Sequence, residues 1–166
     1  DHAHCEKKAA STVISLIFRY QQYPEMMGPL SEVAREELEH FEQVLELLER
    51  RGVRFQALPP SPYAKQLAGH VRSSEPEQFL DRLLCCSLIE ARSCERMKLL
   101  SEGLPEPELR AFYEGLLVSE ARHHHFYVDL ALRYFDRDLV RQRLQELALA
   151  EAEIVSAGSE EPRMHS

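Results

Sequence analysis

Apolar side chains recur at helical spacing along most of the chain, and proline or glycine interrupts the pattern at intervals. An apolar residue at every third or fourth position is typical of an amphipathic helix with one buried face. A half-buried strand would instead need a sustained alternation of apolar and polar residues, which the chain lacks. The pattern predicts an all-α protein with five main helices, over residues 2–22, 30–51, 76–103, 105 or 107–134, and 139–155.

Proline and glycine define the ends of these helices. Pro24 ends the first helix, and Gly52 follows two arginines at the end of the second, where cations and glycine are favoured. Pro76 suits the first position of the third helix. The intervening residues 53–75 contain three more prolines and only a weak helical stretch at 63–71. We therefore expect a long connection here and not a tight turn.

Short turns near residues 23–28 and 102–106 predict two antiparallel hairpins. At about 3.3 Å per residue, the extended connection between the hairpins could run the full length of a helix of about 30 Å. Two hairpins joined by one long crossover are typical of a ferritin-like four-helix bundle. We expect one ferritin-like domain over residues 1–166, with residues 139–155 as an additional C-terminal helix.

Composition changes this picture little. With 166 residues and 44% hydrophobic content, the chain is large enough for one buried core, and its net charge of −8 weighs against a generic nucleic-acid binder without excluding a local basic patch. The four cysteines lack the spacing of a zinc site or a disulfide framework, which favours a reduced, cytoplasmic setting. No apolar run is long enough to predict a membrane span.

Two Glu-x-x-His motifs indicate the first candidate chemistry. They are Glu37 with His40 in the second helix and Glu120 with His123 in the fourth. A spacing of three residues places both side chains of a pair on one helix face. One such pair is weak support, because surface helices contain it by chance. Two pairs on separate helices are the pattern of a dinuclear carboxylate site, which also needs one glutamate from each remaining helix.

The first and third helices supply those glutamates as Glu6 and Glu90. Each precedes the glutamate of its hairpin's motif by 30 or 31 positions, with the predicted turn near the midpoint. Side chains on two antiparallel helices meet only when they lie equally far from the turn, and both pairs meet this condition. The predicted ligands are Glu6, Glu37, His40, Glu90, Glu120 and His123.

The alternative interpretation is that these are solvated charges on amphipathic helices. Glu39 and Glu95 are the nearest competitors as ligands, but Glu39 is one residue out of phase with Glu37, and Glu95 breaks the pairing across its turn. Four carboxylates and two imidazoles without a thiolate suit Fe(II) or Mn(II) better than structural zinc. The carboxylates would repel one another without metal, so we expect metal binding to be linked to stability.

The segments around these ligands closely resemble one bacterial family. They are DHAHCEKKAA at 1–10, AREELEHFEQ at 34–43, IEARSCER at 89–96, SEARH at 119–123 and the closing EPRMHS. The chain resembles the tRNA-(2-methylthio-N6-isopentenyladenosine) hydroxylase family over nearly its whole length. Generic ferritin-like proteins share the ligand spacing but not the IEARSCER block. The resemblance implies that the family's iron ligands are the same six residues.

The resemblance also implies an activity. The expected function is that of an O2-dependent non-haem di-iron monooxygenase, which hydroxylates the isopentenyl group of 2-methylthio-N6-isopentenyladenosine in tRNA, next to the anticodon. Two iron ions, O2 as co-substrate and an external electron donor are implied. An electron-transfer protein or reductase would be that donor, because the sequence has no flavin or nicotinamide fingerprint.

A tRNA substrate requires cationic contacts despite the acidic total. In a ferritin-like topology, five arginines lie at the end of the bundle near the first turn, with few acidic neighbours. They are Arg19, Arg133, Arg137, Arg141 and Arg143. We predict that this group contacts the anticodon arm. Ordinary solvated helix charge is the alternative.

Two other functions remain open at this point. A ferritin-like di-iron redox protein, such as a peroxidase or ferroxidase, would share every predicted ligand, although the sequence has no rubredoxin-type cysteine pair for electron delivery. A metal-free helical bundle could instead serve as an interaction module. Iron content separates this last possibility from both enzymes.

Overall fold

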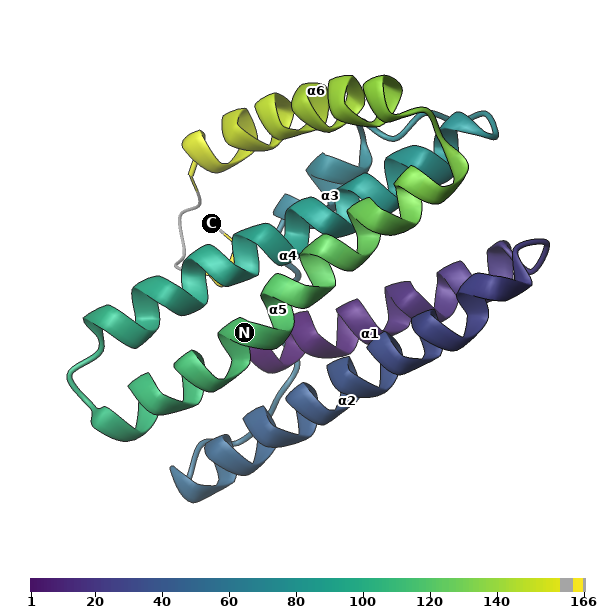
Figure 1. Ribbon diagram of the computed structural model, residues 1–166. Coiled ribbons are helices and arrows are strands. Elements are labelled where there is room, and N and C mark those ends of the chain that lie inside the picture. The colour runs from purple at the N-terminus through teal and green to yellow at the C-terminus, as the bar shows by residue number, and fades with distance from the viewer. Residues whose placement is uncertain (159–162, 166) are drawn as a thin grey trace. The chain divides into compact units, whose positions relative to one another are not determined.

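The computed structural model describes residues 1–158 and 163–165. All regular elements in this part of the chain are helical, so the all-α prediction is confirmed. They are α1 (His2–Arg19), the 3-10 turn η1 (Pro24–Met26), α2 (Met27–Arg50), α3 (Tyr63–Ala68), α4 (Glu77–Gly103), α5 (Pro107–Tyr134) and α6 (Arg137–Ser156) (Figure 1). The chain divides into two compact units, Asp1–Pro60 and Ser61–Ser166.

The first unit is a hairpin in which α1 packs along α2. Its apolar core comes from both helices and includes Ala10, Val13, Leu16, Leu30, Val33, Val44 and Leu47. The first helix ends three residues earlier than predicted, because Tyr20 leaves the helical region at φ −116° and ψ 39°. Pro24 then begins η1, which leads directly into α2 at Met27. The second helix therefore begins before the predicted Leu30.

The predicted glycine stop of α2 is confirmed. Gly52 has a φ of +65°, a conformation that glycine adopts without the strain of a Cβ atom. This lets the N–H of Val53 donate back to the carbonyl of Leu48 at 2.9 Å. The chain then continues without regular structure to residue 60. His4 holds this segment to α1, since its Nε2 donates to the carbonyl oxygen of Gln56 at 2.9 Å.

The second unit is built on the α4–α5 hairpin, with α3 and α6 packed against it (Figure 1). Pro76 precedes α4 as its N-cap, so the prediction that it is the first helical residue was wrong by one position. The C-terminal helix begins two residues earlier than predicted. Its start is fixed by Asp136, whose carboxylate accepts from the N–H groups of Asp138 and Leu139 at 2.9 and 3.2 Å.

A buried charge cluster ties three parts of the second unit together. The carboxylate of Asp81 on α4 is completely buried and accepts from the guanidinium groups of Arg72 and Arg143, at 2.7 to 2.9 Å. Arg72 precedes α4, and Arg143 belongs to α6. Burial opposes ionisation of Asp81, but bonds from Arg143 and Arg72 hold its pKa below the usual range. The cluster therefore fixes α6 to α4 with an ionised carboxylate.

A second polar network fixes the C-terminal tail. The buried Tyr63 donates to Glu151 at 3.0 Å, and Arg92 donates to both oxygens of the same carboxylate at 2.8 Å. His165 stacks on the Tyr63 ring at 5.2 Å, and its Nε2 lies 3.0 Å from the hydroxyl of Ser93. Arg92 and Ser93 belong to the IEARSCER block, which therefore contacts both α6 and the tail.

None of the helices described here has a stretch long and apolar enough to cross a membrane.

Candidate metal centre

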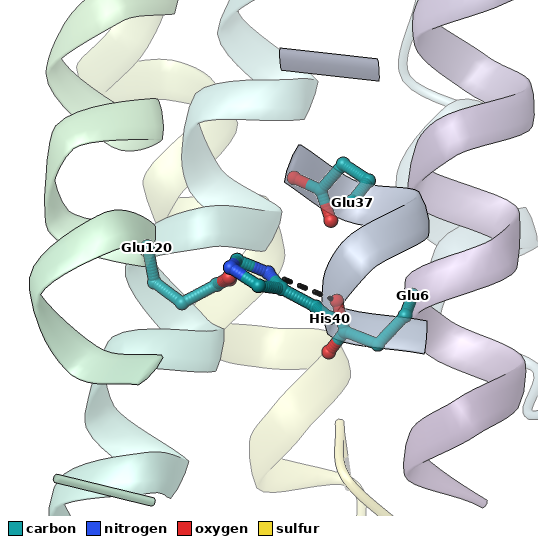
Figure 2. A group of neighbouring side chains, drawn as sticks. All are labelled: Glu6, Glu37, His40 and Glu120. Carbon is teal, nitrogen blue, oxygen red and sulfur yellow. Dashed lines mark ion pairs between the residues drawn. The ribbon is translucent and has the colours of Figure 1, made fainter. Parts of the chain in front are cut away.

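The hairpin of the first unit brings its three predicted ligands together. Glu6 projects from α1, and Glu37 and His40 project from α2 (Figure 2). One ligand atom from each lies within 4.8 Å of the others. All three side chains are buried, and Glu37 is only 1% exposed. The three predicted ligands lie about equally far from the turn between α1 and α2, and they lie side by side in the hairpin, as the spacing predicts.

Contacts with two histidines keep Glu6 ionised. Its Oε1 lies 2.5 Å from Nε2 of His2. Its Oε2 lies 3.6 Å from Nδ1 of His40, the contact dashed in Figure 2. Burial by itself raises the pKa of a carboxyl group, but the interactions with His2 and His40 lower the pKa of Glu6 to about 2. A metal ligand must be deprotonated, so the side chain is already in the form that binds a cation.

His2 is a component that the sequence analysis missed. It lies one turn before Glu6 and is 8% exposed. The signal was present in the chain, because residues four positions apart share a helix face. A Glu-x-x-His motif does not describe a histidine that precedes its carboxylate by four positions, as His2 precedes Glu6.

The second unit forms an equivalent group. Glu90 on α4 and the pair Glu120 and His123 on α5 also offer ligand atoms within 4.8 Å of one another. Their exposed fractions are 4%, 2% and 1%. The two hairpins thus place the same residue types in the same arrangement, as the repeated spacing in the sequence predicts.

The competing residues lie elsewhere. Glu39 is exposed on α2, and Glu95 is exposed on α4, where it pairs with Arg92. Cys94 follows Glu90 by one turn on α4 and is half-buried. Burial and the charge of Glu120 raise the pKa of Cys94 to about 11, so without a metal this thiol stays protonated at neutral pH.

The donor chemistry of each group fits a divalent cation. Each offers two carboxylates and one imidazole, a set that suits Fe(II) or Mn(II). Two carboxylates in a buried position repel each other unless a cation or proton compensates their charge. Each hairpin therefore carries a buried group that can hold a metal ion.

The predicted RNA-contacting arginines differ in their surroundings. Four are exposed on α1, α5 and α6, namely Arg19, Arg133, Arg137 and Arg141. Arg143 is partly buried and donates to Asp81, to the carbonyl of His70 and to Glu146. Its guanidinium is thus engaged in intramolecular contacts, which makes it a weaker candidate for phosphate than the other four.

Known proteins are similar to this chain over most or all of its length. Residues 1–166 match the sequence profile of a family described as tRNA-(MS[2]IO[6]A)-hydroxylase (MiaE). A Pseudomonas putida protein named tRNA 2-(methylsulfanyl)-N(6)-isopentenyladenosine(37) hydroxylase is 44% identical over 166 residues, which are 100% of this chain and 80% of that protein. A Salmonella typhimurium protein of the same name is 39% identical over 132 residues, 80% of this chain and 48% of that protein.

A solved structure is similar over the whole chain. It is described as protein 43 with aldehyde deformylating oxygenase activity from Synechococcus, and it is 48% identical with a TM-score of 0.97. The match covers 100% of this chain and 84% of that one. This likeness confirms the predicted ferritin-like fold class.

Proposed function

Because the chain belongs to the MiaE family of tRNA hydroxylases, we propose that it hydroxylates the isopentenyl group of 2-methylthio-N6-isopentenyladenosine in tRNA, next to the anticodon. The observation that carries the proposal is the repeated ligand group. Each hairpin buries two carboxylates and one imidazole within 4.8 Å of one another. This repetition is what a dinuclear monooxygenase centre requires and what a metal-free interaction module has no need for.

The two groups together would hold a pair of iron ions. The ligands would be Glu6, Glu37 and His40 from one hairpin and Glu90, Glu120 and His123 from the other. Four carboxylates would balance the charge of two divalent cations, and six protein ligands would leave room for O2 at the metal ions. In this proposal residues 1–166 act as a single ferritin-like di-iron domain, and the similarity to a solved chain over both units supports it.

The bound iron pair would supply the activation of O2. One oxygen atom enters a C–H bond of the isopentenyl group, the other leaves as water, and two electrons and two protons balance the reaction. The electrons come from an external electron-transfer protein or reductase. The protein's own contribution is to keep Glu6 ionised through His2 and His40 and to hold all six ligands away from bulk water.

The tRNA substrate places the reaction in the cytoplasm and requires a cationic surface. Arg133 at the end of α5 and Arg137 and Arg141 on α6 are exposed within one unit and are suited to contact phosphates. Solvated helix charge is the alternative for these three side chains. Reversing their charge without loss of tRNA affinity would rule out their contribution.

The test is a single turnover with defined substrate. The protein is loaded anaerobically with Fe(II), mixed with prenylated, methylthiolated tRNA, and exposed once to 18O-labelled O2. Mass analysis of the digested nucleosides should show one labelled oxygen on the modified adenosine. Glu120→Ala should abolish the product, whereas Glu39→Ala, which alters an exposed glutamate, should retain it. Two bound irons without product would favour a peroxidase or ferroxidase, and no bound iron would eliminate the centre.

A second candidate function comes from the solved relative with aldehyde deformylating oxygenase activity, which is 48% identical to this chain. Both activities would use the same metal centre, so ligand variants cannot separate them. A long-chain aldehyde offered in place of tRNA can. Release of formate from the aldehyde, with no oxygen gained by tRNA, would favour this second function.

A further inference from the structure

We propose that the outer face of α1, together with the adjoining segment 53–60, binds an RNA strand through its phosphates and stacks one unpaired base on Phe18. The inference rests on the proposed function, since it identifies where a tRNA substrate is held. The surface, here called the α1 face, lies entirely within the first unit. It would position the RNA and not the reacting adenosine.

The first observation is the distribution of charge along the sequence. The chain has a net charge of −8, yet it contains no aspartate or glutamate from Lys7 to Pro24. The side chains that α1 exposes in this stretch are cations, hydroxyls, one aromatic ring and the apolar Ile14. They include Lys7, Lys8, Ser11, Ser15, Phe18 and Arg19. Lysine and arginine neutralise phosphates, and hydroxyl groups donate to phosphate oxygens.

The neighbouring helix α2 carries a row of acidic side chains, in contrast to α1. Six glutamates recur along α2 at intervals of three or four residues, which places them along one side of the helix. They are Glu32, Glu36, Glu39, Glu42, Glu46 and Glu49, and all except the half-buried Glu36 are exposed. The acidic charge of this hairpin is therefore concentrated on α2. A polyanion would be repelled there, so the contrast favours α1 as the side that RNA approaches.

The segment after α2 extends the α1 face. Residues 53–60 contain no acidic side chain and carry the exposed Arg54. The segment is held against α1 by the bond from His4 to Gln56, and by Phe55, whose ring lies 4.7 Å from the His4 ring and 5.3 Å from the Lys7 ammonium.

A hollow of about 200 Å3 lies between α1 and this segment. His4, Lys7 and Lys8 line it on one side and residues 57–60 on the other, and Asp1 is the one acidic residue in its lining. Two ammonium groups therefore border a concave site that is open to an anionic group. A phosphate with its ribose suits both the charge and the partly apolar wall of prolines.

Phe18 supplies the second element of recognition. Its ring is 72% exposed, next to Arg19 in the sequence and one turn from the exposed Ile14. Proteins that bind single-stranded RNA stack unpaired bases on such rings. From Lys7 to Phe18 the helix rises about 16 Å, and stacked nucleotides advance about 3.4 Å each. The α1 face thus spans roughly five nucleotides, comparable to one side of an anticodon loop.

The absence of acids over so long a stretch argues for a polyanion and against a second protein chain. Among the described residues of the α1 face, five large apolar side chains are exposed, namely Ile14 and Phe18 on α1 and Val53, Phe55 and Leu58 in the adjoining segment. A stable protein interface typically takes roughly 20 to 30 residues from each side, so five apolar side chains spread among cations and hydroxyls are few for its core.

The test measures binding of a fluorescent anticodon stem-loop RNA to the iron-loaded full chain under anaerobic conditions, at several salt concentrations. Phe18→Ala should weaken binding about tenfold, the effect of losing one stacked base, without changing the salt dependence. Phe18→Tyr keeps an aromatic ring and should retain affinity. The triple change Lys7→Gln, Lys8→Gln and Arg19→Gln should weaken binding and reduce the slope of log affinity against log salt by about 2 to 3, since each lost phosphate contact removes about 0.7 to 0.9.

Matched controls use exposed residues of the second unit. Val118→Ala alters a 75% exposed apolar residue of α5, and Lys98→Gln removes an exposed cation of α4. Both should bind like the unaltered protein. Unchanged RNA affinity in Phe18→Ala and in the triple variant would overturn the inference, and so would a change in oligomeric state caused by Phe18→Ala alone.

The outcome is independent of the proposed chemistry. If the unaltered protein hydroxylates tRNA while the α1 variants bind RNA normally, only the inference about α1 fails. If RNA binds through Phe18 and the cations but no oxygen is transferred, only the proposed function fails.

Discussion

The Nδ1 atom of His40 lies 3.6 Å from Oε2 of Glu6, a contact that joins α2 to α1 within the first hairpin. Glu6 in turn contacts His2 through its other oxygen. One carboxylate therefore lies between two imidazoles in a buried position, and its pKa falls to about 2 despite the cost of burial. This arrangement prepares Glu6 to bind a cation and leads to the first two predictions.

Metal should stabilise the protein, and the ligands should account for the effect. At a free Fe(II) or Mn(II) concentration 100 times the dissociation constant, binding to the native state alone adds about 2.7 kcal/mol. The melting temperature should therefore rise with metal in the unaltered protein and in Glu39→Ala. Glu37→Gln should lose this rise. Without metal it should be at least as stable as the unaltered protein, because one of several repelling buried carboxylates is neutralised. Calorimetry with and without metal measures both effects of Glu37→Gln, the lost rise with metal and the retained stability without it. A melting temperature of the unaltered protein that does not respond to metal would contradict the site.

His2→Ala should weaken metal binding without removing a ligand. Residues that orient a metal ligand and keep it ionised typically contribute 10-fold to 100-fold to metal affinity. We therefore expect His2→Ala to lower the metal affinity about tenfold. The matched control is His4→Ala, which alters a histidine of the same helix that contacts Gln56 and not Glu6. Competition with a chelating dye measures both affinities. Equal affinity in the two variants would show that His2 has no role at the centre.

Asp81 should contribute to stability in a pH-dependent way. Its pKa in the folded protein lies below the value of about 3.9 expected in the unfolded chain. The ion pairs with Arg72 and Arg143 therefore stabilise the protein above about pH 4, and this contribution is lost as the pH falls through the native pKa. Asp81→Asn should cost about 3 kcal/mol at pH 7. Urea unfolding at a series of pH values should show this difference shrinking towards acid, and a constant difference would contradict the assignment.

The tail network predicts a smaller effect. Tyr63→Phe removes the hydroxyl that donates to the buried Glu151 and should destabilise the second unit by about 1 to 2 kcal/mol in urea unfolding. Ser93→Ala, which removes only the partner of His165, tests the tail separately. Ser93→Ala should leave global stability nearly unchanged. It should increase hydrogen exchange and protease cleavage in residues 163–165. No change in either variant would mean that the network adds nothing to stability.

Much of the fold and of the candidate centre could be predicted because it depends on local periodicity. Spacing on a helix determines which face a side chain occupies, and distance from a turn determines its level, so Glu6 was correctly expected to meet Glu37 and His40. Helix ends were less predictable. Pro76 and Asp136 act as caps whose positions depend on backbone angles that the hydrophobic pattern does not contain.

Long-range polar partners could not be predicted from spacing. Asp81 pairs with Arg72 and Arg143, which come from separate elements, and no periodic signal links them in the sequence. The pairing with Asp81 also makes Arg143 a weaker candidate for phosphate contact than the other four predicted arginines. Its positive charge in the sequence did not indicate that it has an intramolecular partner. His165 likewise meets Tyr63 only in the folded chain.

The most direct test of the dinuclear centre combines iron analysis with spectroscopy on one sample. Full-length protein reconstituted with 57Fe(II) and then oxidised should contain two irons per chain. Its Mössbauer spectrum should be that of a coupled diferric pair, with no electron paramagnetic resonance signal from isolated ferric iron. His40→Ala and His123→Ala, one from each hairpin, should both lose the coupled spectrum, since each removes a ligand from one half of a shared centre. Two uncoupled ferric ions, or a coupled spectrum that survives either substitution, would contradict a di-iron site built from both hairpins.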